Sequence, residues 1–180
     1  MVAPSAERPS HQISAEAWDD ANERLISHLV ALIRIPTVNP PDPPGPELEA
    51  ARLIGEWLRD AGLEPTIYEP VPGRGSVVAR LRGDGTGGDP LLLLSHLDVV
   101  PAAPANWTHD PFGGVIDNGY VYGRGAVDMK DLVAMEIEVM HLLAAEARAA
   151  GRNPATEPIP GLRRDVLLAV TADEEAGGVD

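Results

Sequence analysis

The sequence predicts an α/β fold with a mixed, largely parallel sheet flanked by helices. Two runs, residues 91–95 and 166–170, are almost wholly apolar. Such runs are typical of strands covered on both faces of a sheet. Three longer segments repeat apolar residues with the helical period. The chain therefore has both kinds of element that this fold class needs.

Three helices are expected, over residues 14–35, 47–61 and 131–149. The first begins at the N-cap Ser14 and ends before Pro36, and the second ends at Gly62. The buried face of the first helix is expected to contain Trp18, Leu25, Leu29 and Leu32. The buried face of the second helix is expected to contain Ala50, Leu53, Ile54, Trp57 and Leu58. The buried face of the third is expected to contain Val133, Ile137 and Met140.

Four segments have the composition of short strands: residues 66–71, 76–82, 91–95 and 165–172. A hairpin over 113–123 is expected to turn at Asn118-Gly119, a dipeptide that suits a type I′ turn. The remaining proline- and glycine-rich stretches, 39–46 and 151–161, indicate loops.

The composition excludes several classes of protein. The 180 residues include 28 acidic and 14 basic side chains, for a net charge of −14, and this argues against a nucleic-acid partner. No apolar stretch reaches the roughly 18–20 residues of a membrane span, and the N-terminus lacks the apolar core of a secretory signal. The cysteine-free chain is therefore expected to be cytoplasmic, without a membrane partner. Residues 1–13 are expected to be disordered.

Ionisable side chains follow both apolar strands. His96 and Asp98 come just after the first, and Asp173, Glu174 and Glu175 just after the second. Ligands of α/β sheets bind beyond the carboxyl ends of the strands. The sequence therefore predicts a functional site at this edge.

Each group of residues also has a plainer explanation. A carboxylate beside a histidine can orient a metal-binding imidazole, but for His96 and Asp98 taken alone a polar loop after a strand is the favoured explanation. Asp128 in "YGRGAVDMKD" is either a metal ligand or the N-cap of the following helix. The acidic run after the second strand either holds a cation or faces a helix N-terminus.

Four segments, in order, resemble motifs of the M20 family of metallopeptidases and related amidohydrolases: "SHLDVVPA", "WTHDPFGG", "YGRGAVDMKD" and "TADEEAGG". This family includes glutamate carboxypeptidases, aminoacylases, acetylornithine deacetylases and succinyl-diaminopimelate desuccinylases. The resemblance implies that residues 14–180 are the N-terminal part of a zinc-peptidase-like catalytic domain, incomplete at the C-terminus. Two late metal ligands and the lid and dimerisation domain of the family are not found in these residues.

The resemblance assigns a role to each candidate site residue. His96 resembles a ligand of one metal, Glu175 a ligand of the other, and Asp128 the carboxylate that bridges both. Asp98 resembles the partner that orients His96, and Glu174 the general base that activates the bridging water. In this family the peptide after the bridging aspartate is commonly cis, so a cis bond is expected between Asp128 and Met129.

The function implied by the resemblance is hydrolysis of an amide bond in peptides or N-acyl amino acids. Two divalent ions are implied, zinc with cobalt or manganese as alternatives, and a homodimer would form through the lid domain. An M28-type aminopeptidase stays open as an alternative, because those enzymes also combine His-x-Asp with a double glutamate. So does a truncated fragment that is inactive or only binds metal. The other histidines are expected to be structural or exposed: His11, His28, His109 and His141.

Overall fold

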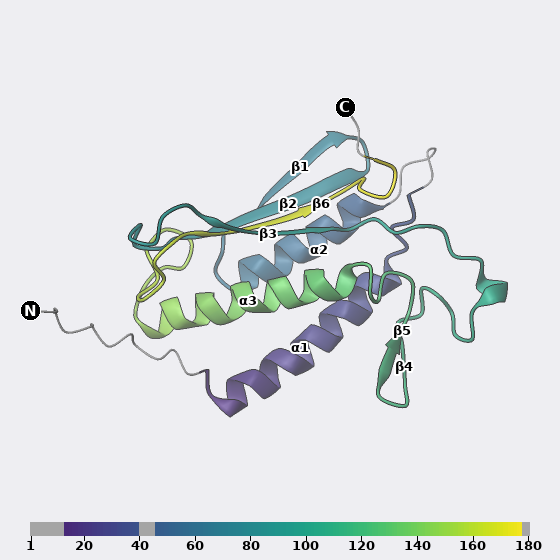
Figure 1. Ribbon diagram of the computed structural model, residues 1–180, viewed down its shortest axis with the longest axis horizontal. Coiled ribbons are helices and arrows are strands. Elements are labelled where there is room, and N and C mark those ends of the chain that lie inside the picture. The colour runs from purple at the N-terminus through teal and green to yellow at the C-terminus, as the bar shows by residue number, and fades with distance from the viewer. Residues whose placement is uncertain (1–12, 40–45, 178–180) are drawn as a thin grey trace, which may run out of the picture.

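The computed structural model describes residues 13–39 and 46–177 (Figure 1). Most of the expected disordered segment and of the loop at 39–46 lies outside these residues, as does His11. None of the described helices is long and apolar enough to cross a membrane.

Four strands form the main sheet in the order β1-β2-β6-β3. They are β1 (Thr66–Val71), β2 (Arg74–Leu81), β3 (Leu91–His96) and β6 (Val166–Thr171). The sheet is mixed, as predicted, because β3 and β6 are parallel whereas β1–β2 and β2–β6 are antiparallel. The prediction of a largely parallel sheet is wrong for the described strands. Only a tight turn joins β1 to β2, and a connection that short permits only antiparallel neighbours.

The three helices all lie on one side of this sheet (Figure 1). They are α1 (Ala15–Arg34), α2 (Glu47–Asp60) and α3 (Lys130–Ala149). The core between helices and sheet is fully buried and aliphatic; it includes Ile54, Leu58, Val77, Ile137, Met140 and Leu168. Burial of these side chains is the main force that holds the helices on the sheet.

The opposite face of the sheet is uncovered in the described structure, so the expected burial of the strands on both faces is not found among the described residues. Leu92 and Leu94 of β3 are 51% and 56% exposed. They lie beside Leu167 and Ala169 of β6 in the parallel register, and these two residues are only partly buried. Four leucines in a row predict burial on both sides, but all the described helices pack on the other face.

Local signals fix the ends of the elements. The Ser14 hydroxyl accepts a hydrogen bond from the Ala17 amide at 3.1 Å and caps α1, and Gly62, with φ of 85°, ends α2. The hairpin of β4 (Val115–Asp117) and β5 (Tyr120–Tyr122) turns at Asn118-Gly119 with positive φ at both residues, as predicted. A short 3-10 helix, η1 (Pro104–Asn106), precedes it.

Trp18 does not belong to the core, contrary to the prediction from periodicity. It is 50% exposed and borders a shallow groove with Val139 and Leu142 of α3. Trp18 lies in the first turn of α1, before the part of the helix in which Leu29 and Leu32 are buried.

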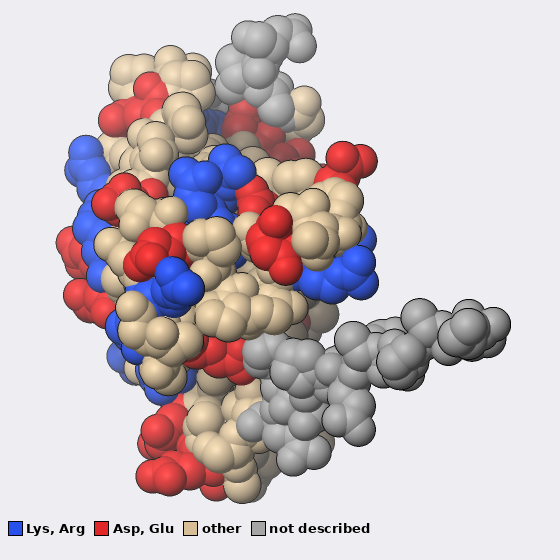
Figure 2. Space-filling model, turned by 90° about the vertical axis from the view of Figure 1, so that its left-hand side faces the viewer, with Lys and Arg blue, Asp and Glu red and all other residues tan. Residues whose placement is uncertain are grey.

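Acidic and basic side chains are interspersed on the end of the molecule shown in Figure 2. Among the described residues, Asp165 pairs with Arg80, and Glu157 lies 3.0 Å from Arg152. The acidic excess therefore does not form a single negative surface on this face.

Candidate metal and active site

The candidate site lies where two parallel strands end. His96 of β3 is level with Thr171 of β6, so residues 96–98 and 173–175 leave the sheet at the same edge. The backbone stays paired beyond the strands, since the Leu97 amide donates to the Thr171 carbonyl at 2.8 Å. The two groups of ionisable side chains predicted from the sequence are thus brought together.

One ring nitrogen of the buried His96 side chain is engaged by the protein and the other faces the site. Nδ1 lies 3.0 Å from the backbone oxygen of Asp98 and 3.4 Å from its carboxylate. Nε2 lies 3.3 Å from Asp128 Oδ1 and 3.7 Å from Glu174 Oε2. A hydrogen-bond partner on one ring nitrogen fixes the ring so that the other nitrogen can bind an ion, and in His96 that other nitrogen is Nε2.

The Asp98 carboxylate is fully buried and ties several segments together. It accepts hydrogen bonds from the backbone amides of Glu174 at 3.0 Å and Glu175 at 2.9 Å, and from Asn39 Nδ2 at 2.8 Å. Burial alone would raise the pKa of Asp98, but the contact with His96 and these hydrogen bonds hold it below its usual value. The same contact raises the pKa of His96 to about 9, against the opposing effect of burial.

Asp128 is not a helix cap. The N-cap position of α3 is Met129, which makes no side-chain cap hydrogen bond, and the Asp128 side chain is 76% exposed on the site side of His96. The Asp128–Met129 peptide is cis, as expected. Close packing accounts for Gly125 in this turn, because a Cβ there would lie 2.8 Å from Val99 Cγ1.

Glu174 and Glu175 follow β6 through a turn in which Asp173 has φ of 68°. No helix that could neutralise Glu174 and Glu175 begins within the described residues 172–177. Their amides are instead bound by Asp98. The pKa of Glu175 is raised, first by burial and then by the carboxylates of Asp128, Asp98 and Glu174, which favours a cation among them.

The donor set fits a divalent metal ion. Ligand atoms of His96, Asp128 and Glu175 all lie within 4.8 Å of one another. One imidazole and two carboxylates suit zinc and similar ions. Among the described residues, no other histidine or acidic side chains form such a group.

Two residues near this site were missed by the sequence analysis: Asn39 and Arg74. Both are buried, and Arg74 donates to Asn39 and to Glu47. Asn39 is the first residue of a proline-rich stretch, and Arg74 is the first residue of β2. No local sequence pattern at either position indicates a role in a functional site.

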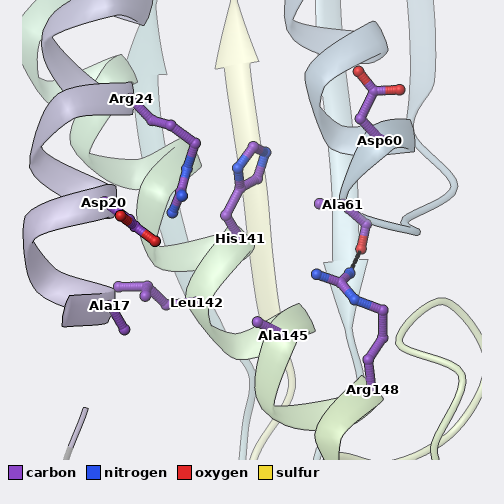
Figure 3. A pocket seen from close by; sticks show the side chains of 9 residues that line it. All are labelled: Ala17, Asp20, Arg24, Asp60, Ala61, His141, Leu142, Ala145 and Arg148. Atoms are coloured by element: carbon purple, nitrogen blue, oxygen red, sulfur yellow. Dashed lines mark hydrogen bonds between the residues drawn. The ribbon is translucent and has the colours of Figure 1, made fainter. Parts of the chain in front are cut away.

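The cavity shown in Figure 3 is a separate feature. It measures 390 Å³ and lies between α1, the end of α2 and the C-terminal half of α3, lined by side chains such as Arg24, His141 and Arg148. Asp128 lies two residues before α3, whereas His141 lies about 17 Å along that helix from Lys130 at 1.5 Å per residue. None of the five predicted site residues lines this cavity.

Comparisons of the sequence with protein families and with individual proteins agree on one family. The model of peptidase family M20/M25/M40 matches residues 92–180, a range that contains all five predicted site residues. A succinyl-diaminopimelate desuccinylase of Methylobacterium nodulans is 37% identical over 154 residues, which are 83% of this chain and 34% of that protein. Aminoacylase-1 of Sus scrofa is 35% identical over 147 residues, 81% of this chain and 32% of that protein.

The fold is also found in a solved structure. Human carnosine dipeptidase 1 superposes with a TM-score of 0.65 at 22% identity, over 91% of this chain and 35% of that chain. The chain spans about a third of the length of the curated relatives described above.

Proposed function

Since the chain belongs to peptidase family M20, we propose that residues 14–180 form the N-terminal part of the catalytic domain of a metal-dependent amide hydrolase. The M28-type alternative is set aside, because the matching family model is that of M20/M25/M40. Activity is proposed for the whole protein that carries this domain, because the chain matches only about a third of its relatives.

The observation that carries this proposal is the convergence of three side chains that could hold a metal ion, beside the exposed carboxylate of Glu174. His96 Nε2, Asp128 and Glu175 offer ligand atoms within 4.8 Å of one another. Glu174 lies 3.7 Å from the same imidazole nitrogen, its side chain is 61% exposed, and it is outside the group that fits an ion. A carboxylate in that place is in contact with solvent beside the candidate metal ligands.

The proposed roles follow from these positions. His96, Asp128 and Glu175 would hold the metal, and Asp98 would orient His96 through Nδ1. Two bound divalent ions, zinc with cobalt or manganese as alternatives, would polarise the amide carbonyl and lower the pKa of the attacking water. Glu174 would accept the proton of that water and pass it to the leaving amine nitrogen. A homodimer formed through a lid domain stays a prediction.

The relatives suggest the substrates to test. Their names describe removal of a succinyl group from diaminopimelate and of acyl groups from amino acids. We propose an N-acyl amino acid or a small peptide as substrate, and N-succinyl-diaminopimelate, N-acetyl amino acids and dipeptides as the first panel.

The proposal is tested with Glu174→Gln in the whole protein. Zinc affinity is measured by calorimetry and hydrolysis by release of free amine. Loss of the general base should lower turnover by roughly 100-fold or more while zinc affinity stays close to that of the unaltered protein. Glu64→Gln, at an exposed position, is the matched control and should leave both unchanged.

Two results would overturn the proposal. Turnover that survives Glu174→Gln would remove Glu174 from its role. A protein that binds zinc but cleaves no member of the panel, with or without the substitution, would favour the alternative of a non-catalytic metal-binding fragment.

A further inference from the structure

A short segment after α1 runs beside the site. Val38 forms a parallel bridge with Val99, the Asn39 amide donates to the Val99 carbonyl at 3.1 Å, and the Val99 amide donates to the Thr37 carbonyl at 3.0 Å. The Thr37 hydroxyl also donates to the Leu97 carbonyl at 2.6 Å. This pairing brings the side chain of Asn39 to the buried carboxylate of Asp98.

The side-chain amide of Asn39 is fully used. Its nitrogen donates to Asp98 Oδ2 and to Asp173 Oδ1, both at 2.8 Å, and its oxygen accepts from the guanidinium of Arg74. Arginine can only donate hydrogen bonds, so the amide oxygen must face Arg74 and the nitrogen must face the two carboxylates. The orientation of Asn39 is therefore set by Arg74.

Arg74 is anchored in turn by acidic groups. It donates to Glu47, the first residue of α2, and lies 3.4 Å from Asp173 Oδ1. Arg74 and Glu47 are 7% and 0% exposed. A buried cation in contact with two carboxylates is stable only in a fixed geometry, because each charge would otherwise be desolvated without a partner.

We infer that Asn39 and Arg74 are positioning residues for the metal site. Neither is among the ligand residues. They act through Asp98: Asn39 holds one carboxylate oxygen, and this fixes the angle at which Asp98 meets His96 Nδ1 and the amides of Glu174 and Glu175. The expected effect on metal binding rests on the proposed function. The expected effect on the amides of Glu174 and Glu175 concerns the metal-free chain and does not depend on that function.

The test uses the 180-residue chain with Asn39→Ala and Arg74→Lys. Hydrogen exchange followed by NMR should show faster exchange at the amides of Glu174 and Glu175, with unchanged protection at Val170 inside β6. The affinity for zinc ion, measured by calorimetry, should fall by up to about 10-fold, less than the roughly 10- to 100-fold that follows loss of a side chain in direct contact with a ligand, because Asn39 and Arg74 act through Asp98. The matched control is Arg80→Lys, on the same strand, whose ion pair with Asp165 is on the surface.

The outcomes separate the two proposals. Unchanged exchange at Glu174 and Glu175 in a folded Asn39→Ala chain would overturn the inference, whatever the zinc affinity. Faster exchange in a chain that binds no zinc even when unaltered would support the positioning role and show that His96, Asp128 and Glu175 do not hold zinc by themselves. If Asn39→Ala fails to fold, Arg74→Lys, which keeps the charge but loses the planar fork, decides the same question.

Discussion

The Oδ2 atom of Asp98 lies 2.9 Å from the backbone nitrogen of Glu175. This hydrogen bond joins the segment after β3 to the segment after β6, and Oδ1 of the same carboxylate binds the amide of Glu174 at 3.0 Å. The side chain that faces the imidazole of His96 thus also fixes the backbone of the double glutamate. Two motifs far apart in the sequence act as one unit because of one buried carboxylate.

Asp98→Asn should therefore weaken metal binding with little change of shape. An amide presents only one accepting atom, so its nitrogen must face either a backbone amide or Asn39 Nδ2, both of which are donors. Zinc affinity is expected to fall about 10- to 100-fold, measured by calorimetry. Asp117→Asn, half exposed in the β4–β5 hairpin, is the control, and equal affinities for the two variants would contradict the prediction.

The uncovered face of the sheet should make the isolated chain self-associate. Leu92 and Leu94 are about half exposed, and exposed apolar patches on an edge strand favour association. The double variant Leu92→Thr and Leu94→Thr keeps residues suited to a strand. It should lower the light scattering of concentrated solutions, whereas Ile116→Thr, an exposed position on β4, should not. A wild-type chain that stays monomeric at all concentrations would show that the exposed leucines of this face do not cause association.

Much of the fold could be predicted because its signals are local. Ser14, Gly62 and the Asn118-Gly119 turn each act within a few residues, and the observed ends of the helices and strands lie within two residues of those expected. The juxtaposition of His96 with the double glutamate was also predictable, because parallel strands that leave a sheet at one edge bring their following residues together.

The parts that could not be predicted depend on contacts between distant segments. The apolar run at β3 does not reveal that only one of its faces is covered. Asn39 and Arg74 are polar residues whose importance comes from a buried network, and a single sequence contains no periodicity that marks such a network. The antiparallel place of β2 beside β6 is likewise a property of the whole sheet.

Lys130→Met should destabilise the chain. Lys130 is fully buried, and its Nζ donates to the carbonyl oxygens of Leu32 and Ile35, each at 2.8 Å. These carbonyls end α1, and methionine would leave them buried without that donor. A loss of about 1–3 kcal/mol in the free energy of unfolding is expected, measured by urea denaturation at neutral pH. Arg152→Met, on the exposed loop, should cost much less, and equal losses would show that the two hydrogen bonds contribute little.

A cluster far from the candidate site should make stability depend on pH. Glu138 of α3 is buried, 3.1 Å from His28 Nδ1, 3.0 Å from Arg24 and 3.8 Å from His141 Nδ1. His28 stacks on Trp57 at 3.9 Å. Burial would raise the pKa of Glu138, but these cationic and hydrogen-bonding neighbours lower it. Burial lowers the pKa of His141, partly opposed by Glu138.

Both shifts favour stability at higher pH. A carboxyl group with a lowered pKa contributes stability above its ordinary pKa of 4.5, and this is lost as the pH falls through the native value. A histidine with a lowered pKa binds its proton less readily in the folded than in the unfolded chain, so its contribution is present above the ordinary value of 6.5 and is lost as the pH falls through the native value. The contribution of His141 to the free energy of unfolding should therefore be larger at pH 7 than at pH 5, opposite in sign to that of His96, whose raised pKa favours the folded state at lower pH.

Substitution identifies the source of this dependence. In His141→Gln, the difference in unfolding free energy between pH 7 and pH 5 should be smaller than in the unaltered chain, because glutamine does not titrate and its amide can still donate to the Trp57 carbonyl, which lies 3.1 Å from His141 Nε2. His109→Gln, in the loop before the hairpin, is the control and should keep the full difference. If His141→Gln leaves the difference unchanged, proton uptake by His141 does not contribute to it, and Glu138→Gln then tests the carboxylate below pH 5.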